Sequence, residues 1–190
     1  MTKLYLFFYY VLMFPIYKLK FGKIGRKTRI KNPLRIDGYK NIHLGQNVLI
    51  QYKTWLASYP IDTNKSSRLS IGENTVIGHF NHIYATKNIT IGKNVLTADK
   101  VYISDNSHSF DDPTIPIMHQ QIKQLNEVFI GDGSWIGENV CIIGASVGKH
   151  SIIGANSVVT KDIPDYSIAV GSPAIVIKQY SFEKKEWIKI

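Results

Sequence analysis

Branched aliphatic residues return at every sixth position over most of the chain. One run is Ile24, Ile30, Ile36 and Ile42, a second is Ile71, Ile77, Ile83 and Ile89, and a third is Ile130, Ile136, Ile142, Val147, Ile153 and Val159, with one step shortened to five. A helix requires apolar residues at intervals of three and four, and a half-buried strand requires them at every second residue. Neither element alone explains a period of six, so the repeat takes precedence over local secondary-structure preferences.

A period of six fits short strands that are joined by turns. Three such strands of about six residues form one triangular coil of about 18 residues, and stacked coils bury the recurring aliphatic side chain in a shared core. The segments GEN, GKN, GEN and GAN supply asparagine and glycine, which tolerate left-handed backbone conformations, at the corners. The sequence therefore predicts an all-β fold, a parallel β-helix, in which the repeated isoleucines are core residues.

Three segments make the pattern specific to one family. They are GHFNHI at 78–83, SDNSHSF at 104–110, and the stretch from WIGENVCI to IIGANSVVTKDIPDYSIAVGSPAIVIK at 135–178. Together with the repeat [LIV]-G-x-x-[STAV]-x, they resemble the hexapeptide-repeat acyltransferases, and most of all the galactoside and maltose O-acetyltransferases and the O-acetyltransferases of capsule and exopolysaccharide clusters. The resemblance implies a left-handed β-helix over residues 24–178. It also implies acetyl-CoA as the donor, a sugar or polysaccharide precursor as the acceptor, and no metal.

The repeat breaks off between residues 104 and 127, around a histidine. Acetyl transfer from a thioester to a sugar hydroxyl needs a base that takes the hydroxyl proton, and neutral imidazole suits this role near pH 7. By resemblance, His108 is the catalytic base and Asn81 contacts the acceptor. Asp105 and Asp111 are candidates to orient the imidazole, and we also assign Asp105 to the substrate site.

The resemblance places the coenzyme in the last coils. The residues expected there are Trp135, Ala155, Thr160, Lys161 and Lys178. Trp135 would border the reactive end of the coenzyme, and Lys178 would reach a phosphate or the adenine edge. The sequence has Ile175 where several relatives carry a basic residue. Loops 57–68 and 104–127 carry most of the polar variety that would face the acceptor.

The resemblance also implies an oligomeric state, and the fold leaves two alternative functions open. In the family that the chain resembles, a neighbouring subunit completes the acceptor site, so we expect a homotrimer. The prism also serves the γ-type carbonic anhydrases, which bind zinc through histidines, and His79, His82, His108 and His119 raise that alternative. Those enzymes place two histidines five residues apart in one segment. This chain contains no H-x-x-x-x-H pair, which argues against the zinc alternative. A non-catalytic scaffold is the third possibility.

The apolar N-terminal segment and the clustered positive charge indicate where in the cell the protein acts. Residues 4–16 are an apolar run, and basic residues cluster at 18–35 and 184–189 within a net charge of +9. Basic residues beside apolar anchors suit an anionic membrane surface, which we prefer to nucleic acid. A run of 13 residues is short of the roughly 20 that span a bilayer. A subunit-packing helix, a core helix and a cleaved signal remain alternatives, although no small-x-small cleavage site follows.

The remaining expectations concern domain bounds and cysteine chemistry. We expect a helical segment at 1–23, the β-helix at 24–178 and a short tail at 179–190. The single cysteine, Cys141, excludes an internal disulfide and fits a reducing compartment. Its place in a repeat suggests packing, so we expect direct transfer without an acetyl-enzyme. The expected location is cytoplasmic, with the inner face of the cytoplasmic membrane as one possibility.

Overall fold

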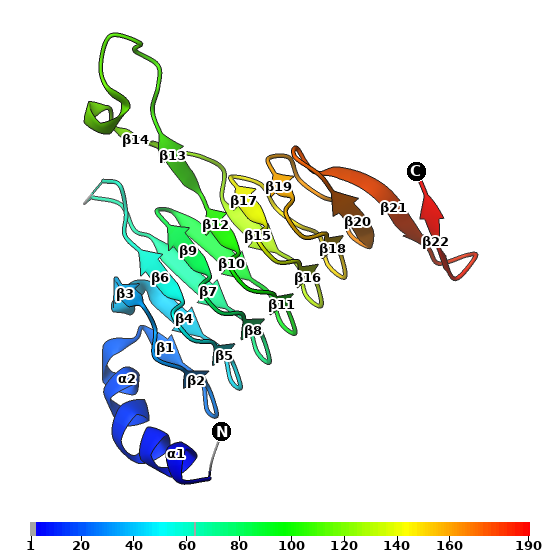
Figure 1. Ribbon diagram of the computed structural model, residues 1–190. Helices are drawn as coiled ribbons and strands as arrows, with labels where there is room; N and C mark the ends of the chain where they lie inside the picture. Colours follow the sequence, from blue (N-terminus) through cyan, green and yellow to red (C-terminus); the bar gives the residue numbers. More distant parts are fainter. Residues whose placement is uncertain (1–2, 63) are drawn as a thin grey trace.

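The computed structural model describes residues 3–62 and 64–190 and shows a three-sided prism of stacked coils (Figure 1). Face A contains β1 (Lys23–Ile24), β4 (Ile42–Leu44), β7 (Arg68–Ile71), β10 (Asn88–Ile91) and β15 (Val128–Ile130). Face B contains β2 (Arg29–Ile30), β5 (Leu49–Ile50), β8 (Val76–Ile77), β11 (Leu96–Thr97), β16 (Trp135–Ile136), β18 (Ile152–Ile153) and β20 (Ser167–Val170). Face C contains β3 (Arg35–Asp37), β6 (Trp55–Ser58), β9 (His82–Ala85), β12 (Tyr102–Ser104), β17 (Cys141–Ile143) and β19 (Val158–Val159). The predicted left-handed parallel β-helix is confirmed.

The core is made of aliphatic ladders that run from coil to coil. On face C, the parallel register places these residues on successive rungs: Leu56, Ile83, Ile103, Ile142 and Val159. All of them are fully buried, as the period of six predicts. Burying each such side chain contributes roughly 1.5–3 kcal/mol, so the ladders supply most of the favourable free energy of folding.

The corners explain why asparagine and glycine recur in the repeat. Asn47, Asn74 and Asn94 occupy the same corner of successive coils with φ between 54° and 59°, a left-handed conformation that asparagine tolerates. The glycine that follows the buried isoleucine has another role. A Cβ atom on Gly72 would lie 2.5 Å from the backbone of Gly92 in the next coil, so the coils can stack closely only if the residue is glycine.

The N-terminal segment forms a cap on one end of the prism (Figure 1). It consists of α1 (Lys3–Phe8), a π-helical turn (Tyr9–Met13) and α2 (Phe14–Lys20). Tyr9, Tyr17 and Phe21 are buried against the first coil, and the Tyr9 hydroxyl accepts a hydrogen bond from the Ile30 N–H at 2.9 Å. None of the described helices has the length and apolar character needed to cross a membrane. We call this element the cap helix.

The C-terminal residues extend face B. β20 pairs antiparallel with β21 (Ile175–Ser181), which pairs antiparallel with β22 (Glu186–Lys189). The parallel coils therefore end near Val170. Residues 175–189, which we expected to be the last part of the β-helix and a tail, form two antiparallel strands instead.

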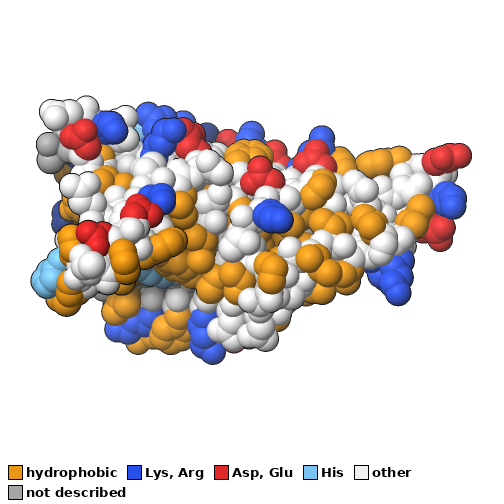
Figure 2. All heavy atoms as spheres, turned by 90° about the horizontal axis from the view of Figure 1, so that it is seen from above, with side chains coloured by type: hydrophobic (Ala, Val, Ile, Leu, Met, Phe, Trp, Pro, Cys, Tyr) orange, Lys and Arg blue, Asp and Glu red, His pale blue; other side chains and the backbone are white. Residues whose placement is uncertain are grey.

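Two excursions interrupt the coils. The first joins β6 to β7, and the second joins β12 to β15. The second is not an irregular loop at its base, because β13 (Asn106–His108) and β14 (Ile122–Gln124) pair antiparallel there. A short 3₁₀-helix lies farther out at Ile117–His119, and another lies before β4 at Tyr39–Asn41. Seen from above the view of Figure 1, hydrophobic side chains cover much of the surface, and acidic and basic side chains are scattered among them (Figure 2).

Candidate active site

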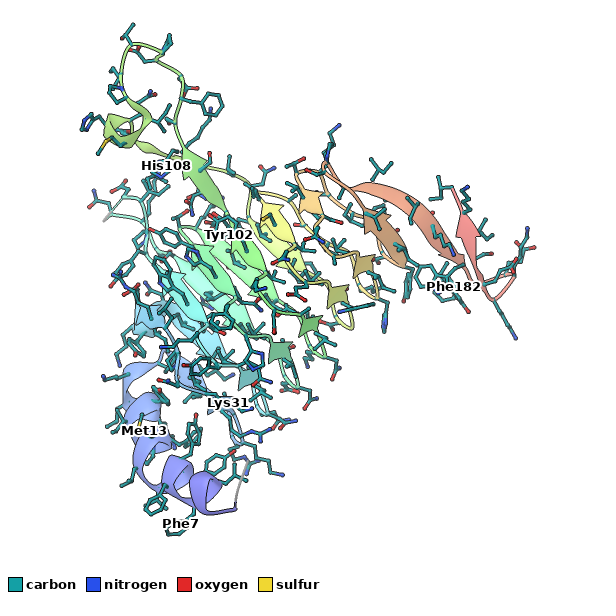
Figure 3. The ribbon with its side chains drawn as sticks, viewed as in Figure 1. Phe7, Met13, Lys31, Tyr102, His108 and Phe182 are labelled. Atoms are coloured by element: carbon teal, nitrogen blue, oxygen red, sulfur yellow. The ribbon has the colours of Figure 1, made fainter. Side chains whose placement is uncertain are left out.

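His108 stands at the base of the β13–β14 hairpin, where the chain leaves the edge between faces C and A (Figure 3). His108 is exposed, and its imidazole makes no hydrogen bond to another residue of the described chain. An exposed imidazole with both ring nitrogens accessible can approach a substrate hydroxyl. The position is therefore compatible with the predicted role of general base.

A cleft of about 920 Å³ lies between the two excursions. Its lining includes Asn64 and Lys65 from the first excursion, and Ile122 and Gln124 from β14. His108 is paired directly with Ile122. Directly opposed residues of an antiparallel pair place their side chains on the same face, so His108 lies on the face of the hairpin that borders the cleft.

Asp105 holds the base of this hairpin. One carboxylate oxygen accepts hydrogen bonds from the N–H and hydroxyl of Thr86, at 2.7 and 2.8 Å. The other oxygen accepts from the N–H groups of Lys87 and Asn88, at 2.8 and 2.9 Å. Asp105 is fully buried and these donors occupy its carboxylate. Asp105 therefore has a structural role in this fold, and its assignment to substrate binding or imidazole orientation stays a prediction.

The second candidate for orienting His108 lies farther out in the excursion. Asp111 is exposed and forms an ion pair with Lys123 at 3.4 Å. No hydrogen bond between Asp111 and His108 is present in the described chain. In a single chain, His108 is therefore positioned by the pairing of β13 with β14 rather than by a carboxylate.

Asn81, the predicted acceptor contact, is also engaged within the prism. Its side chain is buried inside the corner between faces B and C, with an exposed fraction of 1%. The side-chain oxygen accepts a hydrogen bond from the Val101 N–H, and the amide nitrogen donates to the Thr97 hydroxyl. Both ends of the amide are therefore used within the prism, and contact with an acceptor would require them to break.

The expected coenzyme residues are divided among three parts of the prism. Thr160 and Lys161 follow β19 on the edge between faces C and A, the same edge as His108 and two coils farther along. Trp135 lies instead on the outer side of face B, where half of its surface is exposed. Lys178 extends the same row of face B, because it pairs with Ile168.

Ala155 lies at the third place, the corner between β18 and β19. In a three-sided prism, the edge between faces C and A is opposite face B. One chain therefore cannot bring Trp135 and Lys178 beside its own His108. A second chain could present its face B to that edge.

An aromatic stack that the sequence did not predict lies on the outside of face C. His82, one of the histidines of the zinc alternative, stacks on Trp55 with ring centroids 4.0 Å apart and lies 5.3 Å from Tyr102. Burial lowers the pKa of His82, and its Nε2 is buried without a hydrogen-bond partner in the described chain. Only the coil register brings these residues together. Within the described residues, no three His, Cys, Asp or Glu side chains form a group that could hold a metal ion.

The His82 stack predicts a pH dependence of stability. Because the folded pKa lies below the ordinary value of 6.5, neutral His82 contributes stability that is present above that value and is lost as the pH falls through the folded pKa. We expect thermal unfolding temperatures to fall between about pH 8 and pH 5, with a smaller fall for His82→Phe, which retains a ring. His43, whose pKa burial also lowers, contributes equally to both proteins. Identical pH profiles would contradict this assignment.

The prism of stacked coils is also the fold of solved hexapeptide-repeat acetyltransferases. The profile described as "Hexapeptide repeat of succinyl-transferase" matches residues 127–161. The chain is 31% identical over 168 residues to the putative lipopolysaccharide biosynthesis O-acetyl transferase WbbJ of Escherichia coli, covering 84% of this chain and 83% of that protein. The chain belongs to the hexapeptide-repeat acetyltransferase family.

Other relatives agree with this placement. A probable acetyltransferase of Mycobacterium tuberculosis is 44% identical over 118 residues, which is 60% of this chain but only 39% of that longer protein. Among solved structures, the maltose O-acetyltransferase from Clostridium difficile is 30% identical with a TM-score of 0.60, covering 88% of this chain and 74% of that chain. A Vibrio cholerae acetyltransferase complexed with acetyl coenzyme A is 25% identical with a TM-score of 0.62, covering 87% and 75%.

Proposed function

We propose that the protein transfers an acetyl group from acetyl-CoA to a hydroxyl of a sugar or polysaccharide precursor, with His108 as the general base. The observation that carries the proposal is the exposed His108 on the cleft side of the β13–β14 hairpin. The cleft offers the amide side chains of Asn64 and Asn88, which can hydrogen-bond sugar hydroxyls, although the Asn88 amide nitrogen already donates to Glu127. The relatives above include a maltose O-acetyltransferase and a putative lipopolysaccharide biosynthesis O-acetyl transferase, which supports a carbohydrate acceptor.

The proposed reaction is a direct transfer. The imidazole of His108 takes the proton of the acceptor hydroxyl while the oxygen attacks the thioester carbonyl carbon. The tetrahedral intermediate then expels the thiolate of coenzyme A, which takes the proton from the imidazolium. The products are an acetyl ester and free coenzyme A, and no acetyl-enzyme is formed. Cys141 is half-buried on the outer side of face C, away from this edge.

The proposal is tested by an acceptor screen that measures release of free coenzyme A. We expect release above background hydrolysis only when a suitable carbohydrate is present, with one acetyl ester formed for each thiol released. A covalent acetyl group on the protein, found by mass spectrometry before acceptor is added, would contradict direct transfer. Acetylation of amines alone across the panel would contradict the assigned acceptor group.

We also propose that the active form is a cytoplasmic homotrimer. The opposite positions of His108 and Trp135 in one prism support sites shared between neighbouring chains. Cyclic closure gives three identical contacts without open-ended growth.

The trimer predicts a particle of three times the 21.6 kDa chain mass in light scattering. Mixing a His108→Ala protein with a Trp135→Ala protein and allowing exchange of subunits should restore part of the activity, because some shared sites then contain both native residues. A fully active particle with the mass of one chain would rule the trimer out.

A further inference from the structure

The positive charge of the chain is concentrated at one end. Residues 1–45 contain ten Lys and Arg residues and one Asp, a net charge of +9 that equals that of the whole chain. The rest of the sequence contains thirteen basic and thirteen acidic residues. Because residues up to 45 form the cap helix and the first coils, the entire excess charge lies at the capped end of the prism.

The same end carries a large exposed apolar surface. The outward side chains of the cap helix are Phe7, Phe8, Val11, Leu12, Met13, Ile16 and Leu19. The exposed fractions reach 61% for Phe7, 57% for Leu12 and 78% for Leu19. Phe7 and Met13 point away from the prism (Figure 3). The helix therefore packs one side on the core and presents an apolar second side.

Basic side chains surround this apolar surface. Lys18 and Lys20 lie in the last turn of α2, and Lys23 follows directly in β1. Among the described basic residues at this end, only Arg35 forms an ion pair with a carboxylate, that of Asp37, at 2.6 Å. Lys31 and Lys40 donate hydrogen bonds within the protein, whereas Lys18, Lys23 and Lys27 are exposed and can contact an external anion. Lysine side chains beside an apolar helical face are typical of helices that lie in the interface of a membrane.

We propose that the cap helix docks on a membrane surface that contains anionic lipids. Its apolar side enters the boundary between headgroups and acyl chains, and the basic residues contact the headgroups. The prism then stands with its capped end toward the bilayer and its coenzyme-binding coils farther away. A second copy of the chain is a poorer occupant of this surface, because pairing two caps would bring two ends of +9 charge together.

The test is co-sedimentation of the full chain with lipid vesicles. We expect binding to vesicles containing about one third phosphatidylglycerol, and at least tenfold weaker binding to phosphatidylcholine alone, with further weakening as salt is raised. The variant Leu12→Gln/Leu19→Gln should bind at least tenfold more weakly. The variant Lys18→Gln/Lys23→Gln/Lys27→Gln should lose about fivefold for each cation that contacts the surface.

Matched controls separate docking from misfolding and from general charge. Lys184→Gln/Lys185→Gln removes two exposed cations from the opposite end and should leave vesicle binding unchanged. All variants should keep the unfolding temperature and the coenzyme A release of the parent protein in solution. Equal binding to neutral and anionic vesicles would overturn the proposal, as would an equal loss in the control. Conversion of a larger assembly into a smaller one by Leu12→Gln/Leu19→Gln, without any effect on vesicle binding, would instead assign the surface to a second copy.

Discussion

Replacing His108 with alanine should lower kcat for acetyl transfer by about 100-fold or more, the size expected for loss of a general base. The imidazole is exposed beside the cleft, and its β13 backbone remains paired with β14 in the variant. The change therefore removes the proton acceptor without removing the hairpin. Since an alcohol is a weak nucleophile at neutral pH, residual turnover should rise with pH as hydroxide replaces the lost base.

His119 offers a matched control because it is exposed in the same excursion, in the 3₁₀-helix at Ile117–His119. His119→Ala should keep kcat within about twofold of the parent protein if His108 alone acts as the base. Both variants should unfold at the parent temperature. Undiminished turnover of His108→Ala with an acceptor that the parent protein uses would remove His108 from the mechanism.

The period of six was sufficient to predict the stacked parallel coils and their buried core. It did not give the register, because neighbouring rungs such as Ile83 and Ile103 are 20 residues apart instead of about 18. A side chain that recurs at this spacing takes the inward position on the next face of the prism, as Ile71, Ile77 and Ile83 do on faces A, B and C. Thr97 shows the tolerance of the pattern, since it occupies a buried position on face B, where its hydroxyl oxygen accepts a hydrogen bond from the Gly78 N–H.

The direction of individual polar side chains could not be read from the repeat. A resemblance places Asn81 in the right segment, but the corner turns its amide into the prism, where Val101 and Thr97 bind it. A single sequence does not distinguish an inward asparagine from an outward one, because both conformations fit the same spacing. The same limit applies to Asp105, whose role depends on backbone N–H groups about 18 residues earlier.

The hairpin at the base of the long excursion was also beyond sequence analysis. β13 and β14 contain three residues each, too few for a recognisable alternation. Their pairing brings His108 to the side of the cleft. Contacts between chains could not be predicted either. The repeat fixes which residues point inward, but it does not indicate what contacts the outer side of face B, where Trp135 lies.

Replacing Asp105 with alanine should produce the largest loss of stability among the residues of this region. The change leaves the N–H groups of Thr86, Lys87 and Asn88 without their acceptor in a buried corner. The Thr86 donors are buried and those of Lys87 and Asn88 are part-buried. Each unpaired buried group costs about 1–3 kcal/mol, so the free energy of unfolding should fall by about 2 kcal/mol or more. Denaturant unfolding followed by circular dichroism measures this fall. Asp105→Asn, which keeps the shape but turns an N–H₂ group toward one set of donors, should lose less.

Asp111→Ala is the matched control for this prediction. Asp111 lies in the same excursion, but its ion pair with Lys123 is exposed, and such pairs contribute about 1 kcal/mol or less. The two aspartates should also differ in local order. Because Asp105 ties the corner before β10 to the start of β13, Asp105→Asn should expose the hairpin to limited proteolysis between residues 106 and 124, while Asp111→Ala should not. If Asp105→Ala unfolded at the same denaturant concentration as Asp111→Ala, the carboxylate would not be the element that holds His108 at the edge of the prism.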